Sequence, residues 1–530
     1  MSENQSAVSQ YQNIHRLILQ GQLENAGRAC QLLVEKHPTF APGWAAFSEL
    51  WLRCGVLDKA GAAAQHGLQI EPESSELATQ LAKCMHFSGQ LAGAMHFANI
   101  ALKNAPDTVI QLDTLGNIFA RFGKHETATE LFEEAQRLAP DSPGIMFNLA
   151  TSQRLLGRSE AAEELLNQVL AVNPTDADAH YSLSLVRRQT ASENHIERLE
   201  KQLDTSRRWQ DKVKIRYALA KELEDLERYE ASFEQLQEGA SLFSKYANYS
   251  LEDELAGMAS MQNATSKDKL TEIAEMAPPS DVNNNPIFIV GLPGSGTKIV
   301  EQILAAHSEV ETGGDVRTFQ AATAHGSKQS GAKITDLAHL AGLIDELDYP
   351  AIAKAYLEMA ELQVGTTRHF LDTFPLNVFQ VPVIHMALPT ARIILIERDP
   401  LETGYAMFKT LFQNGFHASY DLETLAEYHL SYQQWVDHLK KVLPSSALLT
   451  LRHADIVSEP EGELQRLLDF CALGSQEACS DSARAITSSA VDGNDNLDPQ
   501  VFDEVTNHYK NVEKHMAVYA QTLARNEANT

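Results

Sequence analysis

The first half of the chain repeats one pattern of small, apolar and turn-forming residues with a period of 34 residues. Three residue types keep this period in a single register over five units, which chance does not explain. Such a period predicts stacked copies of one unit, because each copy buries its apolar face against its neighbours. The series are Gly21, Gly55, Gly89, Gly123 and Gly157; Ala26, Ala60, Ala94, Ala128 and Ala162; and Pro38, Pro72, Pro106, Pro140 and Pro174.

The offsets within each unit resemble those of the tetratricopeptide repeat (TPR), a pair of antiparallel helices. Glycine falls where the two helices turn, alanine where they touch, and proline where the second helix ends. We therefore expect residues 1–245 to form an all-α TPR solenoid with five clear repeats and an imperfect sixth. In the sixth repeat, Leu226 is expected at the turn and Ala231 at the helix contact.

Stacked repeats of this kind leave a concave groove, which commonly binds an extended peptide. Two roles stay open for this groove. It holds a protein or peptide partner, or the array is a spacer that docks on its own second domain. A Pro/Asn/Ser-rich run then ends the helical pattern, which predicts a linker over residues 246–285 and a second domain over residues 286–525.

The second half of the chain alternates short apolar runs with longer stretches of helical periodicity. This alternation predicts a parallel sheet with helices on both faces. Ligands of such sheets bind beyond the carboxyl ends of the strands. The predicted strands are Ile287–Val290, His369–Thr373, Arg392–Ile396 and Ala447–Leu451.

The first predicted strand leads into a glycine-rich loop and then a helix. This order points backbone N–H groups and the positive helix end at one place, which suits a phosphate; a tight turn without a ligand is the alternative. A Walker A loop needs lysine directly after its last glycine, whereas Thr297 precedes Lys298 here, which disfavours a kinase or NTPase. The candidate phosphate-binding residues are Gly291, Pro293, Gly294, Ser295, Gly296, Thr297 and Lys298.

Composition narrows the classes of partner. Forty-three basic and 71 acidic residues give a formal net charge of −28, which disfavours general binding to nucleic acid or anionic membranes. Neither a basic leader nor an apolar run of membrane-spanning length is present, so we expect a cytoplasmic protein. The five cysteines form no CxxC motif or Cys/His cluster, and we expect reduced thiols and no metal site.

Several motifs occur in one order over nearly the whole chain and resemble those of TPR-containing sulfotransferases. That family uses 3′-phosphoadenosine 5′-phosphosulfate (PAPS). FIVGLPGSGTKIVEQIL resembles the family's 5′-phosphosulfate loop, and IERDPLETGYA resembles its 3′-phosphate element. AHSEVETGGD, HFLDTFPLN and EPEGELQRLLDFC are further landmarks. The resemblance implies a P-loop-like α/β sulfotransferase fold and transfer of a sulfuryl group from PAPS to a hydroxyl acceptor, on a protein or glycan presented by the array, without a metal.

The resemblance also assigns residue roles. It implies that the loop from Gly291 to Thr297 holds the 5′-phosphate, that Arg398 holds the 3′-phosphate, and that Asp315 is the catalytic base for the acceptor. We further hypothesise that Lys298 is a relocated catalytic cation. The alternatives are that Asp315 is an ordinary loop or cap carboxylate and that Lys298 is simply exposed on its helix.

The chain departs from the family at charged and hydroxyl contacts. The family's arginine, lysine and serine positions are Gly294, Thr373 and Ala406 here, and the C-terminal segment lacks the family's Arg, Gly and Trp. Each charged hydrogen bond is worth about 1.5–3 kcal/mol, so several uncompensated losses would abolish useful PAPS binding. The second hypothesis is therefore an inactive pseudo-sulfotransferase that serves as a TPR scaffold. Cations available for compensation are Arg317, Arg368, Lys409 and Lys510.

Overall fold

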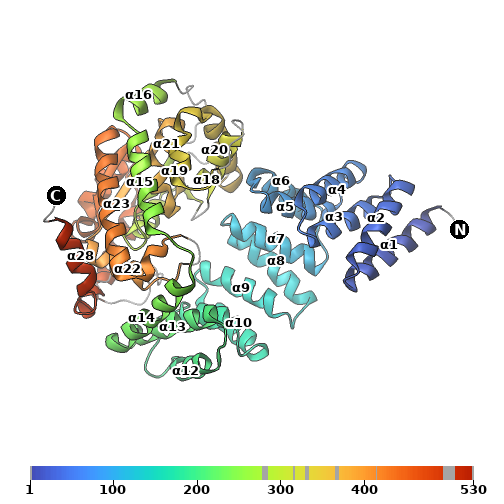
Figure 1. Ribbon diagram of the computed structural model, residues 1–530, viewed down its shortest axis with the longest axis horizontal. Helices are drawn as coiled ribbons and strands as arrows, with labels where there is room; N and C mark the ends of the chain where they lie inside the picture. The colour runs from blue at the N-terminus through green and yellow to red at the C-terminus, as the bar shows by residue number, and fades with distance from the viewer. Residues whose placement is uncertain are drawn as a thin grey trace. The chain divides into compact units, whose positions relative to one another are not determined.

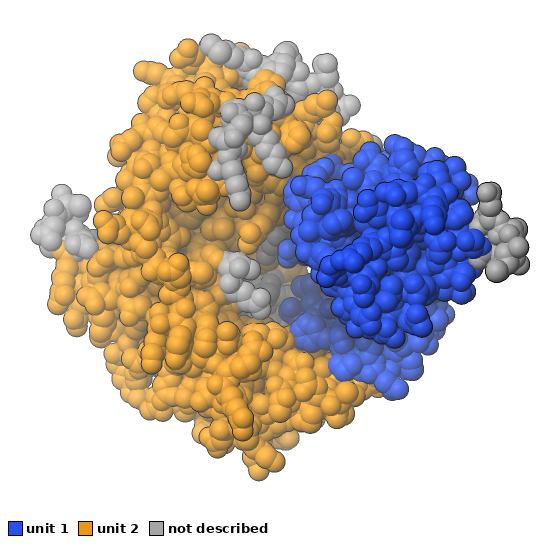
Figure 2. Space-filling view, turned by 45° about the vertical axis from the view of Figure 1, so that its right-hand side comes forward, with its two compact units in different colours: residues 1–156 blue, residues 157–530 orange. Residues whose placement is uncertain are grey.

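The computed structural model describes residues 3–276, 285–313, 317–328, 334–364, 369–412, 415–492 and 508–527. By its internal contacts the chain divides into two compact units, Met1–Leu156 and Gly157–Thr530, which Figure 2 shows in two colours. The second unit holds the later helices of the array as well as the sheet. Each unit is described by itself.

The first unit consists of antiparallel helix pairs (Figure 1). At the turn within each pair, the repeated glycine has φ between +70° and +71°, a conformation that favours glycine. The repeated alanines from Ala26 to Ala128 are 0% exposed, which lets the paired helices approach closely. These features confirm the predicted TPR solenoid. Its helices are α1 Glu3–Leu19, α2 Leu23–Lys36, α3 Ala41–Arg53, α4 Leu57–Ile70, α5 Ser75–Phe87, α6 Leu91–Lys103, α7 Val109–Arg121, α8 His125–Leu138 and α9 Pro143–Leu155.

The second unit begins with the remaining helices of the array. The predicted register of the sixth repeat is one residue too early, because Glu227 and not Leu226 has the positive φ of +58° at the turn. Ser232 and not Ala231 is the buried small residue, and its hydroxyl donates to the carbonyl of Ala220 at 2.7 Å. The helices are α10 Ser159–Val172, α11 Ala177–Ser184, α12 Ile196–Thr205, α13 Trp209–Asp225 and α14 Tyr229–Tyr246.

The segment 246–285, expected as a linker, contains two helices, α15 Leu251–Ala264 and α16 Lys267–Met276. The side chain of Ser250 caps α15 by accepting from the backbone N–H of Asp253 at 3.2 Å. Three acidic residues occupy the first turn of α15, where negative charge stabilises a helix. The Pro/Asn-rich residues 277–284 lie outside the described part of the chain.

A parallel five-stranded sheet with the order β2-β3-β1-β4-β5 forms the centre of the second unit in the residues described. Ile287 of β1 lies opposite Leu371 of β3 on one side and Arg392 of β4 on the other. All four predicted strands are present, whereas β2 was not predicted. The strands are β1 Asn285–Val290, β2 Val310–Thr312, β3 His369–Asp372, β4 Arg392–Glu397 and β5 Leu448–Arg452.

Helices cover both faces of this sheet, as the sequence predicted. On one face, Ile289 packs in a buried cluster with Ile303 of α17 and Leu467 of α25. On the other, Phe288 stacks on Tyr356 of α20 with ring centroids 5.4 Å apart. The helices are α17 Thr297–Ala305, α18 Thr318–Lys328, α19 Leu337–Gly342, α20 Tyr349–Val364, α21 Val381–Ala387, α22 Pro400–Phe408, α23 Leu422–Val442, α24 His453–Ser458, α25 Pro460–Cys471, α26 Glu477–Asp492 and α28 Ala517–Glu527, with the short 3₁₀ helices η1 Ile344–Glu346, η2 Pro375–Gln380, η3 His417–Tyr420 and η4 Tyr509–Asn511.

The last helix pair of the array, α13 and α14, packs directly on the sheet domain. The ammonium of Lys409 lies 2.9 Å from a carboxylate oxygen of Glu224 in α13. Phe243 of α14 stacks on Tyr420 with ring centroids 3.8 Å apart. Within the described residues, no helix combines the length and apolar character needed to cross a membrane.

Candidate functional site

The glycine-rich loop connects β1 to the N-terminus of α17. Gly294 and Gly296 have φ values of +79° and +104°, so both adopt left-handed conformations that favour glycine. A Cβ atom on Gly296 would lie 2.7 Å from the ring of His453, which leaves no room for a side chain. The backbone N–H of Ser295 donates to the carbonyl of Leu292 at 3.0 Å and closes the turn. The predicted loop therefore has the tight backbone that an anion-binding turn requires.

The hydroxyl of Ser295 is the clearest sign of a ligand in this loop. The residue is 2% exposed, and its Oγ atom has no hydrogen-bond partner in the described part of the protein. Buried hydroxyls usually have a partner, because an unpaired one costs free energy. An anionic oxygen bound in the loop would supply the missing acceptor.

Arg398 follows the end of β4 and reaches the same loop. Its Nη1 donates to the carbonyl of Gly294 at 2.8 Å, and its Nε donates to the carboxylate of Glu402 at 2.8 Å. The side chain is 3% exposed. The structure thus brings Arg398 to the loop, as the motif order predicts, but a carboxylate already contacts the guanidinium that is expected to hold a phosphate.

Lys298 lies in the first turn of α17. Its ammonium is 2.9 Å from a carboxylate oxygen of Glu301, whose other oxygen accepts from the hydroxyl of Thr312 at 2.6 Å. The space beside Gly294 that we hypothesised for this ammonium is filled by the methyl group of Ala406. Lys298 therefore lies near the loop but is not inserted beside Gly294.

The other predicted site residues have different outcomes. Asp315 and Arg368 lie outside the described residues. Thr373, at the family's lysine position, is buried, and Asp372 before it accepts hydrogen bonds from Asn377 at 2.7 Å and Tyr356 at 3.3 Å. Of the four cations considered for compensation, Lys409 forms the ion pair with Glu224 that is described above.

A cavity of about 270 Å³ opens beside the loop, with Ser295, Arg398, Thr403 and His429 in its wall. His429 is a residue that the sequence analysis missed, because a single histidine in an amphipathic helix carries no signal. Burial lowers the pKa of His429 to about 4, and its Nδ1 lies 2.9 Å from the hydroxyl of Tyr519. The wall also includes the hydroxyl of Tyr432 and the carboxylates of Glu397 and Asp437. The cavity thus combines a guanidinium, three hydroxyls, a neutral imidazole and two carboxylates.

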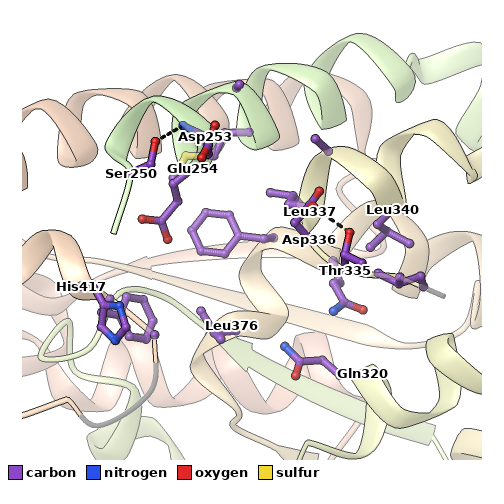
Figure 3. Close-up of a pocket in the computed structure, with 18 of the residues that line it drawn as sticks. Ser250, Asp253, Glu254, Gln320, Thr335, Asp336, Leu337, Leu340, Leu376 and His417 are labelled. Carbon is purple, nitrogen blue, oxygen red and sulfur yellow. Dashed lines mark hydrogen bonds between the residues drawn. The ribbon is translucent and has the colours of Figure 1, made fainter. Parts of the chain in front are cut away.

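A larger cavity of about 920 Å³ lies among α15, α18, α19 and η2. Figure 3 shows Glu254 of α15 and its cap Ser250 along one side, and His417 across from a third group of residues. That group consists of Thr335, Asp336, Leu337 and Leu340. This second cavity has room for an acceptor molecule. No cluster of three metal-ligating side chains occurs among the residues that the structure describes.

Comparison with known proteins defines the class of both regions. Residues 286–477 match a family model described as the sulfotransferase family, and residues 120–185 match one described as a tetratricopeptide repeat. The chain therefore joins tetratricopeptide repeats to a sulfotransferase-family domain, which confirms the recognition made from the motifs.

Individual relatives are distant. A protein of Aquifex aeolicus without an assigned function is 24% identical over 355 residues, which cover 65% of this chain and 46% of that protein. A protein of Caenorhabditis briggsae named "Putative protein-tyrosine sulfotransferase" is 22% identical over 192 residues, 35% of this chain and 65% of its own length. The chain thus spans less than two thirds of either relative.

Solved TPR structures are also similar to the array. YrrB, described as a TPR protein with an unusual peptide-binding site, has 14% identity and a TM-score of 0.29, and the match covers 39% of this chain and 96% of YrrB. PilW, a type IV pilus biogenesis factor, has 17% identity and a TM-score of 0.31, with 46% and 96% covered. The repeat fold is assigned from the helices and turns of this protein described above.

Proposed function

We propose that this protein is a sulfotransferase that moves a sulfuryl group from PAPS to a hydroxyl acceptor. The observation that carries this proposal is the buried, unpartnered hydroxyl of Ser295 in a left-handed glycine loop beside Arg398. The loop and Arg398 follow β1 and β4, which are neighbours in a parallel sheet, so both lie at the edge where such sheets bind ligands. Family membership of residues 286–477 supports the same reaction.

In this proposal the residues divide the work. Residues Gly291 to Thr297 bind the 5′-phosphate through backbone N–H groups and the helix N-terminus, and Arg398 binds the 3′-phosphate. Asp315 accepts the proton of the attacking hydroxyl, and Lys298 stabilises the negative charge that develops on the leaving phosphate oxygen. Bound PAPS supplies the sulfuryl group, and the proposed step uses no metal.

The repeat array is proposed to bind a protein or peptide, and so to present the acceptor. Stacked TPR units form a concave surface that commonly binds a peptide, which supports protein–protein interaction in general. The formal net charge of −28 argues against nucleic acid and anionic membrane as partners. We propose a cytoplasmic location for the same protein.

A second candidate is an inactive scaffold that keeps the sulfotransferase fold. It is favoured by the carboxylates beside the candidate cations, with Glu402 on Arg398 and Glu301 on Lys298. A phosphate must compete with each carboxylate for its cation. The loss of the family's arginine at Gly294 removes a further source of positive charge.

Calorimetric titration of the full chain with adenosine 3′,5′-bisphosphate separates the two candidates, with AMP and ATP as controls. A sulfotransferase is expected to bind the bisphosphate with micromolar affinity and AMP much more weakly, because only the bisphosphate reaches Arg398 with a 3′-phosphate. If the folded protein binds none of the three nucleotides, the result would favour the scaffold.

The matched variants are R398Q and R392Q. Arg392 lies at the opposite end of the same strand, where it donates to the carbonyl of Ser446 at 2.6 Å. R398Q is expected to lose selectivity for the 3′-phosphate, whereas R392Q should keep it. Equal losses in both variants would contradict the role of Arg398.

A further inference from the structure

The larger cavity lies on the edge of the sheet where the strands end. β3 ends at Asp372, and η2, which follows directly, contributes Leu376 and Phe379 to the cavity wall. α18, which contributes Gln320, follows β2. Because β1 and β3 are parallel neighbours, this is also the edge that carries the glycine-rich loop. The cavity is therefore on the side from which an acceptor would approach.

The charge of the cavity wall is negative. Asp253 and Glu254 of α15 and Asp336 before α19 all line it, and Figure 3 shows all three around the central space. Among the described lining residues there is no lysine or arginine, and His417 carries positive charge only when protonated. The remaining wall is largely apolar, with Met258, Leu337, Leu340, Leu376, Phe379 and Phe416.

Glu254 is the carboxylate best placed to select a ligand. It is half-buried, and the hydroxyl of Tyr249 donates to its Oε2 at 2.6 Å. Burial raises the pKa of Glu254, and the bond from Tyr249 only partly opposes this effect. A cation that enters the cavity would favour the ionised form of this carboxyl group, because an opposite charge compensates for lost hydration.

We propose that this cavity is the acceptor site and that it selects a hydroxyl compound with an apolar body and a protonated amine. The volume of about 920 Å³ suits a small molecule or a short segment of a larger one. The large apolar side chains of the wall favour an aromatic or aliphatic body, and Gln320 lies in the same wall as a hydrogen-bond partner for its hydroxyl. An acidic peptide is disfavoured by three wall carboxylates. The acceptor role rests on the proposed sulfotransferase function, whereas the ligand class rests on the cavity alone.

Three phenols of similar size test the ligand class with the full chain. Tyramine carries a positive charge, 4-hydroxyphenylacetate a negative one, and 4-methylphenol none. Binding is measured by calorimetry without nucleotide. We expect tyramine to bind roughly ten- to a hundredfold more tightly than 4-hydroxyphenylacetate, with 4-methylphenol between them. Equal affinities, preference for the anion, or no binding of any of the three would overturn the proposal.

Variants connect the preference to Glu254. E254Q removes the charge but keeps the shape of the side chain. It should lower the affinity for tyramine about tenfold and leave the affinity for 4-methylphenol unchanged. E252Q is the matched control on the same helix, because Glu252 is exposed and does not line the cavity. L376W fills the cavity and should weaken all three phenols. Loss of tyramine binding in E252Q, or its persistence in L376W, would place the phenol elsewhere and overturn the proposal.

This design separates the cavity from the proposed function. If the charge preference is found but adenosine 3′,5′-bisphosphate does not bind, the cavity selects cations in a protein that lacks the sulfotransferase donor site. If the nucleotide binds but the three phenols do not differ, the sulfotransferase proposal survives and the acceptor assignment is wrong.

Discussion

Gly294 packs against Ala406 so closely that a Cβ atom on the glycine would overlap the methyl carbon of the alanine. These are two of the positions at which the chain departs from the sulfotransferase motifs. They lie in contact although the sequence separates them widely. The two departures are therefore coupled by packing: a small residue in the loop accommodates the methyl group of α22.

G294A should destabilise the second unit by roughly 2–4 kcal/mol, from the left-handed backbone and from overpacking against Ala406. The double variant G294A/A406G should be more stable than the sum of the single effects predicts, because the clash is relieved. Urea unfolding of G294A, A406G and the double variant measures this coupling. G462A is the control: a Cβ there meets nothing within 4 Å, so a neutral or slightly stabilising effect is expected. Strict additivity would contradict the contact.

Glu402 competes with a phosphate for the guanidinium of Arg398. E402Q keeps a hydrogen-bond acceptor but removes the negative charge, so it should raise the affinity for adenosine 3′,5′-bisphosphate about tenfold. The affinity for AMP should rise much less, since AMP has no 3′-phosphate. The control is E423Q, measured by the same calorimetry, because Glu423 is an exposed residue at the start of α23. An unchanged affinity in E402Q, with measurable binding in the parent, would mean that Arg398 does not hold the 3′-phosphate.

The repeat array was predictable almost residue by residue, because its period fixes turns and contacts together. Gly21 and its successors must turn left-handed, and Ala26 and its successors must be small, so the sequence carries both signals. The sixth repeat shows where this fails. Its turn uses Glu227, a residue with no turn signature, and its buried contact uses Ser232, whose hydroxyl needs the carbonyl of Ala220.

The candidate site was predictable as a location but not as a set of contacts. Strand order and the glycine loop predicted that Gly296 and Arg398 lie at one edge. The partners of the cations, Glu402 and Glu301, could not be read from the motifs, because an i,i+4 or i,i+3 pair can equally face solvent. His429 reaches the cavity only through the packing of α23, which no local pattern encodes.

The pair of Glu224 and Lys409 should fix the last repeat to the sheet domain. Burial alone would raise the pKa of Glu224, but Lys409 and its other partners lower it to about 2. E224Q leaves Lys409 with little compensation and should cost about 3–5 kcal/mol of stability. The double variant E224Q/K409M should be less destabilised than E224Q.

Urea unfolding of the second unit measures both effects. D481N is the matched control, because it breaks an exposed surface pair with Arg484 and should cost no more than about 1 kcal/mol. A cost in E224Q as small as in D481N would mean that the buried pair does not hold the two elements together.

His429 should make the second unit sensitive to mild acid. Its pKa is lowered by burial from 6.5 to about 4, so the unfolded chain binds a proton that the folded protein does not bind between these values. Above about pH 6.5, His429 therefore does not lower the free energy of unfolding. As the pH falls towards 4 the free energy of unfolding decreases, by about 2 kcal/mol between pH 7.5 and pH 5. H429N should lose this part of the pH dependence, while H96N, at an exposed histidine, should keep it. Urea unfolding at both pH values gives the difference for each protein. The same slope in H429N and in the parent would mean that the pKa of His429 is equal in the folded and unfolded states, and the predicted effect of its burial would then be wrong.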